Sequence, residues 1–380
     1  MGHLAARTLE IVAALLIVAA ALAAIVLELF PRSWPAAQLN AVAVLATTEH
    51  TPVLAWAVRA VTREPRIEET VVAGAPSTVL RPGRGRGPWP AIVFVNGATR
   101  EGRFHPKVQR LAQGLARSGF LVVVPDLPGL RKGQITQATA DAAVRVAEAT
   151  ADRPDARGGR VGFYGVSVGA SLALLAAERP ALAPRVTVVG GEAPWTDLRR
   201  IVELATTGDY NGEPYATDPY ASLAIARSLA AGLPPSTGRT RLVRQLDAVP
   251  DDAPEPLAGL GPNVYEDGPR ALAELLLNHD RARFDSLYAR LPERVRDSVE
   301  ALSPLRGASR LTAPVELASS PHDKYFPPAE SYAVARRAPR VHVTVTSTFD
   351  HAVPHPSLGD LRSFFRFDGF VVRFLHHAKQ

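Results

Sequence analysis

The residues with the clearest chemical meaning are Gly165-Val166-Ser167-Val168-Gly169, which form the pattern G-x-S-x-G. In this pattern a nucleophilic serine sits on a very tight turn between a strand and a helix, and glycines two residues to either side relieve the crowding. The segment RVGFY precedes the pattern and ASLALLAAERP follows it. This strand–turn–helix context predicts Ser167 as a nucleophile; an ordinary glycine-rich turn is the alternative.

Short β-branched runs alternate with amphipathic stretches from about residue 69, which is typical of a mostly parallel sheet flanked by helices. Several runs are almost entirely apolar, as strands buried on both faces are. The expected strands are 69–73, 77–81, 90–95, 120–124, 160–164, 185–190, 314–318 and 341–345. The expected helices between them are 107–118, 135–152, 168–178 and 329–337.

The interval 197–303 breaks this alternation. It holds helix-like stretches at 222–231, 239–246, 270–278 and 281–301, separated by segments rich in proline and glycine. Because long structureless loops are rare in compact domains, the interval is predicted to be a helical cap inserted into the core. The predicted division is a membrane anchor (1–32), a helical connector (33–68), the α/β core (69–196, continued with the C-terminal tail in 304–380) and the cap (197–303).

The segments 69–196 and 303–366 resemble the α/β-hydrolase superfamily, in the neighbourhood of its dienelactone-hydrolase-like and esterase-like members. The resemblance covers about half of the chain. It rests on the serine turn, on VNGAT after the third expected strand, on VVVPDLPG after the fourth and on APVELASSPHDKYFP near the end. It implies an α/β-hydrolase fold and cleavage of carboxylic esters or thioesters through a Ser-His-Asp triad and an acyl-enzyme.

The resemblance also implies a base and an acid. A serine hydroxyl needs a base to remove its proton, and in this family the partners follow in the order serine, acid, histidine. His351, in TFDHAVPH after the last expected strand, is the implied base. His355 is its close rival, and His342 lies within the strand itself.

The implied acid is Asp323, in SSPHDKYFP after the strand 314–318, where a carboxylate would orient the imidazole. A turn-forming aspartate is the alternative interpretation. Asp126, in PDLPG, fits a structural turn better, and Asp350 is awkward as a partner of its own sequence neighbour.

The family usually stabilises the oxyanion with backbone N–H groups after the nucleophile and after the third strand, which implies Val168 and Ala98. This chain has Asn96-Gly97 where the family more often has His-Gly. Because the donor belongs to the backbone, that difference leaves the predicted oxyanion hole in place. No metal-ligand spacing, phosphate loop or dinucleotide fingerprint is visible, so the predicted chemistry uses no cofactor.

Composition limits the partners. The chain has no cysteine, which excludes disulfides and thiolate metal sites. Lys+Arg 43 against Asp+Glu 37 gives a net charge of only +6 over 380 residues. The densest basic cluster, Arg81, Arg84 and Arg86, lacks interleaved aromatic residues, so nucleic-acid binding has little support.

The N-terminal segment 11–27 is uninterruptedly apolar and about as long as a helix that crosses a bilayer, roughly 17–25 residues. It predicts a single-pass anchor. A cleaved signal peptide ending near Ala21-Leu22-Ala23 and a soluble hydrophobic helix are the alternatives. The charges around the segment favour an amino terminus inside the cell and therefore an extracytoplasmic catalytic domain.

The cap is the expected specificity element, with Glu192, Trp195 and the stretch 210–220 either lining the mouth or packing within the cap. A membrane location suggests a lipophilic small-molecule ester as substrate. An acyltransferase with the same triad and a catalytically silent binding protein remain the alternatives. The aromatic tail FFRFDGFVVRFLHHAKQ is expected either to lie on the bilayer or to pack as a final helix against the sheet.

Overall fold

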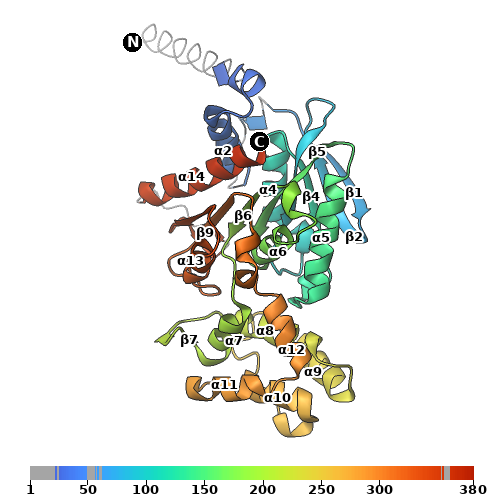
Figure 1. Cartoon of the computed structure of the whole chain (residues 1–380), viewed down its shortest axis with the longest axis vertical. Coiled ribbons are helices and arrows are strands. Elements are labelled where there is room, and N and C mark those ends of the chain that lie inside the picture. Colours follow the sequence, from blue (N-terminus) through green and yellow to red (C-terminus); the bar gives the residue numbers. More distant parts are fainter. Residues whose placement is uncertain are drawn as a thin grey trace, which may run out of the picture.

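The computed structural model describes residues 22–23, 25–48, 56, 58–59, 62–351, 353–354 and 360–380. Its main sheet has eight strands in the order β1-β2-β4-β3-β5-β6-β9-β10 (Figure 1). Their bounds are β1 Arg66–Val72, β2 Ala75–Arg81, β3 Trp89–Val95, β4 Leu121–Pro125, β5 Ala156–Val166, β6 Val186–Glu192, β9 Val315–Ser319 and β10 Val341–Val345. Each of the eight expected strands overlaps one of these.

The six strands from β4 to β10 pair in parallel, whereas β1 pairs with β2 and β2 with β4 in antiparallel fashion. The expected mostly parallel sheet is therefore confirmed. Strand β3 shows why its sequence is continuously apolar. Ile92 and Phe94 are buried in one core cluster and Val93 and Val95 in the other, because successive side chains point to opposite faces of a sheet that is covered on both.

Helices α5 (Gln137–Ala151), α6 (Val168–Ala177) and α13 (Ala329–Ala335) contribute to the core on one face of the sheet. Helices α2 (Trp34–Thr48), α4 (Pro106–Arg117) and α14 (Leu361–Ala378) contribute to the core on the other. The C-terminal tail thus forms a helix against the sheet, with Phe370, Phe374 and Leu375 fully buried. Short 3-10 helices lie at Gly102–Phe104, Leu130–Lys132, Ala183–Arg185, Pro262–Val264, Pro304–Arg306 and Ala308–Arg310.

The interval between β6 and β9 forms a helical lobe, seen below the sheet in Figure 1. It contains α7 (Leu198–Thr207), α8 (Pro219–Gly232), α9 (Thr237–Asp247), α10 (Asp267–Leu276), α11 (Arg281–Ala289) and α12 (Glu293–Ala301), with a small hairpin of β7 (Asp209–Tyr210) and β8 (Glu213–Pro214). The expectation of one helix over 281–301 is wrong. Pro292 precedes α12 with φ −49° and ψ 139° and ends the helical path.

The lobe is tied to the core by Glu330, a completely buried carboxylate on α13. It accepts hydrogen bonds from the backbone N–H groups of Thr196 and Asp197 at 2.6 and 2.7 Å and from the Tyr210 hydroxyl at 2.6 Å. Arg200 of α7 forms an ion pair with it at 3.2 Å. A buried charge satisfied in this way fixes the start of the lobe relative to the sheet.

The predicted anchor segment 11–27 lies for the most part outside the described residues. Within the described part of the chain, no helix has the length and apolar character needed to span a membrane. The helix that follows, α2, packs on α4 and α14, and the Trp34 ring stacks on His376 of α14 with centroids 3.9 Å apart. This start of the predicted connector is therefore part of the folded core layer.

Candidate active site

Ser167 occupies the turn between β5 and α6 with φ 56° and ψ −125°, a backbone conformation that is unusual for a residue with a side chain. A Cβ at Gly165 would overlap the backbone of Gly169 and Ala170, and one at Gly169 would overlap the carbonyl oxygen of Val95. Both glycines are therefore required by close backbone packing. The Ser167 N–H also donates to the carbonyl oxygen of Glu192 at 2.7 Å, which fixes the turn to β6.

Three predicted residues from the carboxyl ends of different strands come together at this turn. His351 Nε2 lies 2.7 Å from Ser167 Oγ, and His351 Nδ1 lies 3.0 and 2.9 Å from the two carboxylate oxygens of Asp323. With the proton on Nδ1, the imidazole donates to Asp323 and accepts from the Ser167 hydroxyl. This tautomer is the one that removes a proton from serine.

Asp323 is completely buried, yet its charge is well satisfied. Its Oδ1 accepts hydrogen bonds from the N–H groups of Tyr325 and Phe326 at 2.8 and 2.9 Å. The Tyr215 hydroxyl donates to the carbonyl oxygen of Asp323, and burial raises the pKa of that hydroxyl to about 12, with Asp323 and Asp350 adding to the rise. The carboxylate is thus held in one orientation from several directions.

His351 lies in the turn of a small hairpin formed by β11 (Phe349–Asp350) and β12 (Val353–Pro354) and has φ 54°. Its ring packs against Tyr325 at a tilt of 34° with centroids 4.3 Å apart, and it meets Phe326 edge-on with centroids 5.5 Å apart. Sequence reasoning missed both aromatic residues as supports of the imidazole. Their position directly after the predicted acid was the available signal.

The other candidate histidines and aspartates, where the structure describes them, have different surroundings. His342, on β10, is exposed and pairs with Glu316 at 3.6 Å. His355 lies outside the described residues. Asp126 joins a separate cluster of charges, and the Asp350 Oδ1 is buried without a hydrogen-bond partner among the described residues. Among the described candidates, Asp323 is the carboxylate that contacts Nδ1 of His351.

The predicted oxyanion donors, Val168 and Ala98, both line the cavity at Ser167. Val168 begins α6, where N–H groups have no partner within the helix and the helix dipole favours negative charge. A Cβ placed on Gly97 would lie 3.5 Å from Ser167 Cβ, so the loop after β3 passes directly beside Ser167. Neither the Val168 nor the Ala98 N–H donates a hydrogen bond within the described chain.

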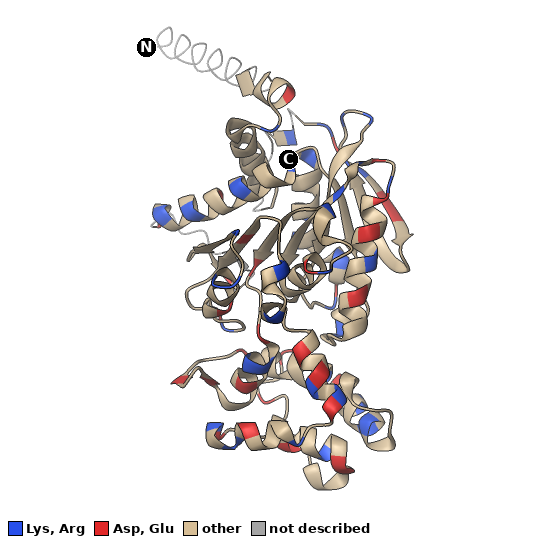
Figure 2. Ribbon diagram, viewed as in Figure 1, with Lys and Arg blue, Asp and Glu red and all other residues tan. Residues whose placement is uncertain are grey.

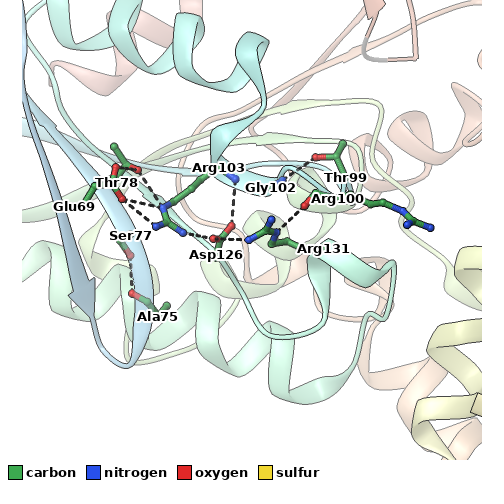
Figure 3. A network of polar contacts seen from close by, with 10 residues as sticks. All are labelled: Glu69, Ala75, Ser77, Thr78, Thr99, Arg100, Gly102, Arg103, Asp126 and Arg131. Carbon is green, nitrogen blue, oxygen red and sulfur yellow. Dashed lines mark hydrogen bonds and ion pairs between the residues drawn. The ribbon is translucent and has the colours of Figure 1, made fainter. Parts of the chain in front are cut away.

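A cluster of charges holds the loop that carries Ala98 (Figure 3). Asp126, directly after β4, accepts a hydrogen bond from the Arg103 N–H at 3.2 Å and forms an ion pair with its guanidinium. Arg103 also donates to Glu69 of β1 at 3.0 Å, and Arg131 donates to the carbonyl oxygen of Arg100 at 2.7 Å. The cluster thus ties the loop to the strands on one side of the sheet.

The cap holds the same loop from the other side. The Tyr220 hydroxyl of α8 donates to the carbonyl oxygen of Ala98 at 3.1 Å. Burial, together with the charge of Asp251, raises the pKa of Tyr220 to about 12, so the hydroxyl remains a donor at neutral pH. The position of Ala98 therefore depends on both the core and the cap.

Ser167 opens into a cavity of about 470 Å³, within the range of small-molecule sites. Its walls are mostly apolar. Glu192 and Trp195, both named as candidates for the mouth, line it together with Tyr220. Glu192 accepts a hydrogen bond from the Tyr164 hydroxyl, whose pKa is raised well above its usual value by burial. No group of side chains suited to hold a metal ion is found among the described residues.

The strand order, the helices on both faces and the serine turn at the carboxyl end of β5 define an α/β-hydrolase-like fold. The profile of the X-Pro dipeptidyl-peptidase (S15 family) matches residues 76–209, about a third of the chain, which includes β2 to α7 and the serine turn. A comparison with curated proteins gave no match.

Solved structures with a similar fold share little sequence with this chain. Dienelactone hydrolase from Anabaena variabilis is 12% identical, with 84% of this chain and 100% of that chain covered and a TM-score of 0.47. Dipeptidyl peptidase 4 from Porphyromonas gingivalis is 13% identical, with 85% and 37% covered and a TM-score of 0.48. Est1E from Butyrivibrio proteoclasticus is 13% identical, with 82% and 98% covered and a TM-score of 0.46.

Proposed function

We propose that this protein is a serine hydrolase that cleaves carboxylic esters or thioesters. The observation that carries the proposal is the line of hydrogen bonds from Asp323 through His351 to Ser167, which ends in an apolar cavity. A buried carboxylate, an imidazole and a serine in this geometry form the arrangement used for acyl transfer through a covalent intermediate.

The proposed reaction has two halves. His351 Nε2 takes the Ser167 proton while Oγ attacks the substrate carbonyl carbon, and the Val168 and Ala98 N–H groups donate hydrogen bonds to the oxyanion that forms. His351 then returns the proton to the leaving alcohol or thiol, and the acyl group stays on Ser167. Water, activated by the same imidazole, releases the carboxylic acid and restores the serine.

Peptide hydrolysis is a second candidate, favoured by the match of the S15 peptidase profile to residues 76–209. Acyl transfer to an alcohol uses the same triad and differs only in what attacks the acyl-enzyme. A catalytically silent binding protein is the remaining alternative. It is disfavoured because the serine, base and acid are all present and in contact.

Steady-state kinetics on matched substrates tests the proposal. The full chain in phospholipid nanodiscs is assayed with p-nitrophenyl esters, thioesters and Xaa-Pro p-nitroanilides, beside Ser167→Ala. We expect turnover of esters that falls by a factor on the order of 10⁶ in the variant. Faster cleavage of the anilides would replace the esterase assignment with a peptidase, and ester products formed in added alcohol would indicate a transferase.

We also propose that the chain is held in a membrane by its N-terminal segment, with the catalytic domain on the extracytoplasmic side. Large apolar side chains are exposed in the described part of this segment and up to the first residue of α2: Leu22, Ile25, Leu29, Phe30 and Trp34. Exposed apolar clusters of this kind are typical of membrane contact. Deletion of residues 1–32 should release the protein from sedimented membranes, and a truncated protein that still sediments would contradict the anchor.

A further inference from the structure

The cavity at Ser167 extends to both sides of the nucleophile. On one side it is bounded by Leu198 of α7 and by Ala224 and Ile225 of α8, which we call the cap arm. On the other side it is bounded by Leu45 of α2 and Leu111 of α4, together with residues of α14; we call this side the helix arm. The two arms adjoin the two different core clusters that cover opposite faces of the sheet.

The helix arm reaches deep between the sheet and α14. Leu115, Phe374 and Leu375 line it and are essentially inaccessible to solvent, with exposed fractions of 1%, 1% and 0%. Leu45, Leu111 and Phe367, which pack against the same cluster, are only partly buried and leave the space of the arm between them. Walls of this kind offer an extended alkyl chain apolar contact along its length, and the polar lining residues that α2 and the start of α4 add to the cavity are Thr48, His105 and Lys107.

One polar group in this wall, the Tyr164 hydroxyl, is already engaged. The Tyr164 hydroxyl donates to the Glu192 carboxylate, and the Tyr164 ring packs against Phe94 and Phe374 with centroids 5.7 and 5.0 Å away. The Tyr164 hydroxyl thus points to Glu192, while the Tyr164 ring forms part of the apolar wall. The contacts that the interior of the arm offers a ligand are therefore mainly apolar.

We propose that the helix arm holds the acyl chain of a medium- or long-chain ester, an inference that rests on the proposed function. The acyl group stays on Ser167 through both halves of the reaction, whereas the alcohol departs after the first. An arm with a buried floor suits the part that stays. The cap arm then faces the alcohol, which takes its proton from His351 and leaves.

The location of the arm fits a substrate that partitions into lipid. Helix α2, which forms one wall, directly follows the exposed apolar segment near the amino terminus (Figure 1). Leu361, Phe364 and Phe365 are exposed on the first turns of α14, and Phe364 also lines the cavity. Basic residues recur along the same helix (Figure 2). Arg362 and Arg366 are exposed, as on surfaces that lie against anionic lipid, whereas Arg373 pairs with the buried Glu316.

The test compares two matched substrate series on the full chain in phospholipid nanodiscs. One series varies the acyl chain of p-nitrophenyl esters, and the other varies the alcohol of acetate esters. Leu111→Trp narrows the helix arm and Ala224→Trp narrows the cap arm. Leu45→Phe narrows the helix arm from its opposite wall and replaces Leu111→Trp if that variant loses its cooperative thermal transition.

In the unmodified protein, kcat/KM should rise about fourfold with each added methylene until the arm is full, since each buried CH₂ contributes about 0.8 kcal/mol. Leu111→Trp should lower kcat/KM for dodecanoate esters at least about tenfold and leave acetate esters within about twofold. Ala224→Trp should lower kcat/KM for acetate esters of the larger alcohols. A Leu111→Trp effect that is equal at all acyl lengths, or that falls on the alcohol series, would overturn the proposal.

Equilibrium binding separates failure of the arm from failure of the hydrolase. Radiolabelled dodecanoate should bind Ser167→Ala in nanodiscs above the level of empty discs, and Leu111→Trp added to that variant should weaken binding about tenfold. If no ester is turned over while binding still responds to Leu111→Trp, the arm stands and the proposed hydrolysis falls. If esters are turned over but neither readout responds to acyl length, the arm falls and the hydrolase stands.

Discussion

The turn around Ser167 and the loop around Ala98 both line the cavity, and different forces hold them in place. At the turn, backbone atoms pack so closely that Gly165 and Gly169 admit no side chain. At the loop, charges and hydrogen bonds from β1, β4 and the cap converge on residues 97–104. The first arrangement is local and steric, and the second is assembled from distant segments.

This difference has consequences for substitution. A tightly packed turn loses its function abruptly on substitution. An added Cβ must displace the neighbouring main chain, and that displacement also moves Ser167. A network of polar contacts fails by degrees, because each contact contributes only part of the orientation. We therefore expect the largest catalytic losses at the turn and graded losses at the loop.

Outside the triad residues, the largest effect is expected from Gly169→Ala, because the new Cβ would overlap the Val95 carbonyl oxygen. Displacing the turn by about 1 Å should lower kcat on the order of a hundredfold. Gly232→Ala is the matched control, since a Cβ there meets no atom within 4 Å. Ester hydrolysis and thermal unfolding of both variants test this, and a fully active Gly169→Ala would contradict the steric account.

At the loop, Asp126→Asn removes the carboxylate that anchors Arg103 and should lower kcat about tenfold, less than the turn substitution. The unfolding free energy should fall by about 2 kcal/mol, because a largely buried guanidinium loses one of its two carboxylate partners and keeps Glu69. Asp155→Asn is the control, since Asp155 pairs with Arg81 and Arg153 far from Ser167 along the sheet. Equal loss of kcat in the two variants would show that the Asp126 effect is only structural.

The contact from the cap is expected to matter less. Tyr220→Phe removes the single hydrogen bond to the Ala98 carbonyl oxygen and should lower kcat about fivefold, the value of a net contribution near 1 kcal/mol. Tyr288→Phe is the control, because the Tyr288 hydroxyl is buried in the cap without a partner among the described residues. Equal kcat values for the two variants would show that the hydrogen bond from Tyr220 in the cap does not help to position Ala98.

The contrast between turn and loop also marks what the sequence was able to predict. The turn was recognisable because its steric requirement selects the residue types at five consecutive positions, 165–169, which directly follow a strand pattern. Asp323 and His351 followed from the family resemblance and the strand that precedes each. By contrast, Arg103 and Asp126 are 23 positions apart, and only the folded sheet brings them together.

Other features were hidden for similar reasons. The helix arm is formed by residues of α2, α4 and α14, from opposite ends of the chain, and no local pattern announces it. Helix α7 was missed although Asp197 caps it by accepting a hydrogen bond from the Arg200 N–H. The break before α12 was readable at Pro292, because proline disfavours a helical residue before it.

The smallest catalytic effect is expected from substitution of Glu178, at the carboxyl end of α6, the helix that follows Ser167. Glu178 caps α6 at its negative end, and burial raises the pKa of its carboxyl to about 8 despite the positive charges of Arg310 and Arg179. Because the folded state holds this proton more tightly than the unfolded state, the unfolding free energy should fall as pH rises from about 4.5 to 8.

The fall attributable to Glu178 between pH 5 and 8 should be on the order of 3 kcal/mol. Glu178→Gln should flatten the profile while leaving kcat unchanged. Urea unfolding at several pH values measures this. A pH dependence that is identical in the variant would show that Glu178 is already ionised in the folded protein at pH 5.

Reaction with a fluorophosphonate probe tests the central claim, that Ser167 is an activated nucleophile, most directly. The full chain in nanodiscs is labelled and the modified peptide is mapped by mass spectrometry, beside Ser167→Ala, His351→Ala and Ser171→Ala. Ser171 is the matched control, a buried serine of the same helix that donates to the Trp195 carbonyl oxygen at 2.8 Å. The account predicts label on Ser167 that the first two variants lose and Ser171→Ala keeps. A well-folded protein that takes no label, or label that persists in Ser167→Ala, would contradict it.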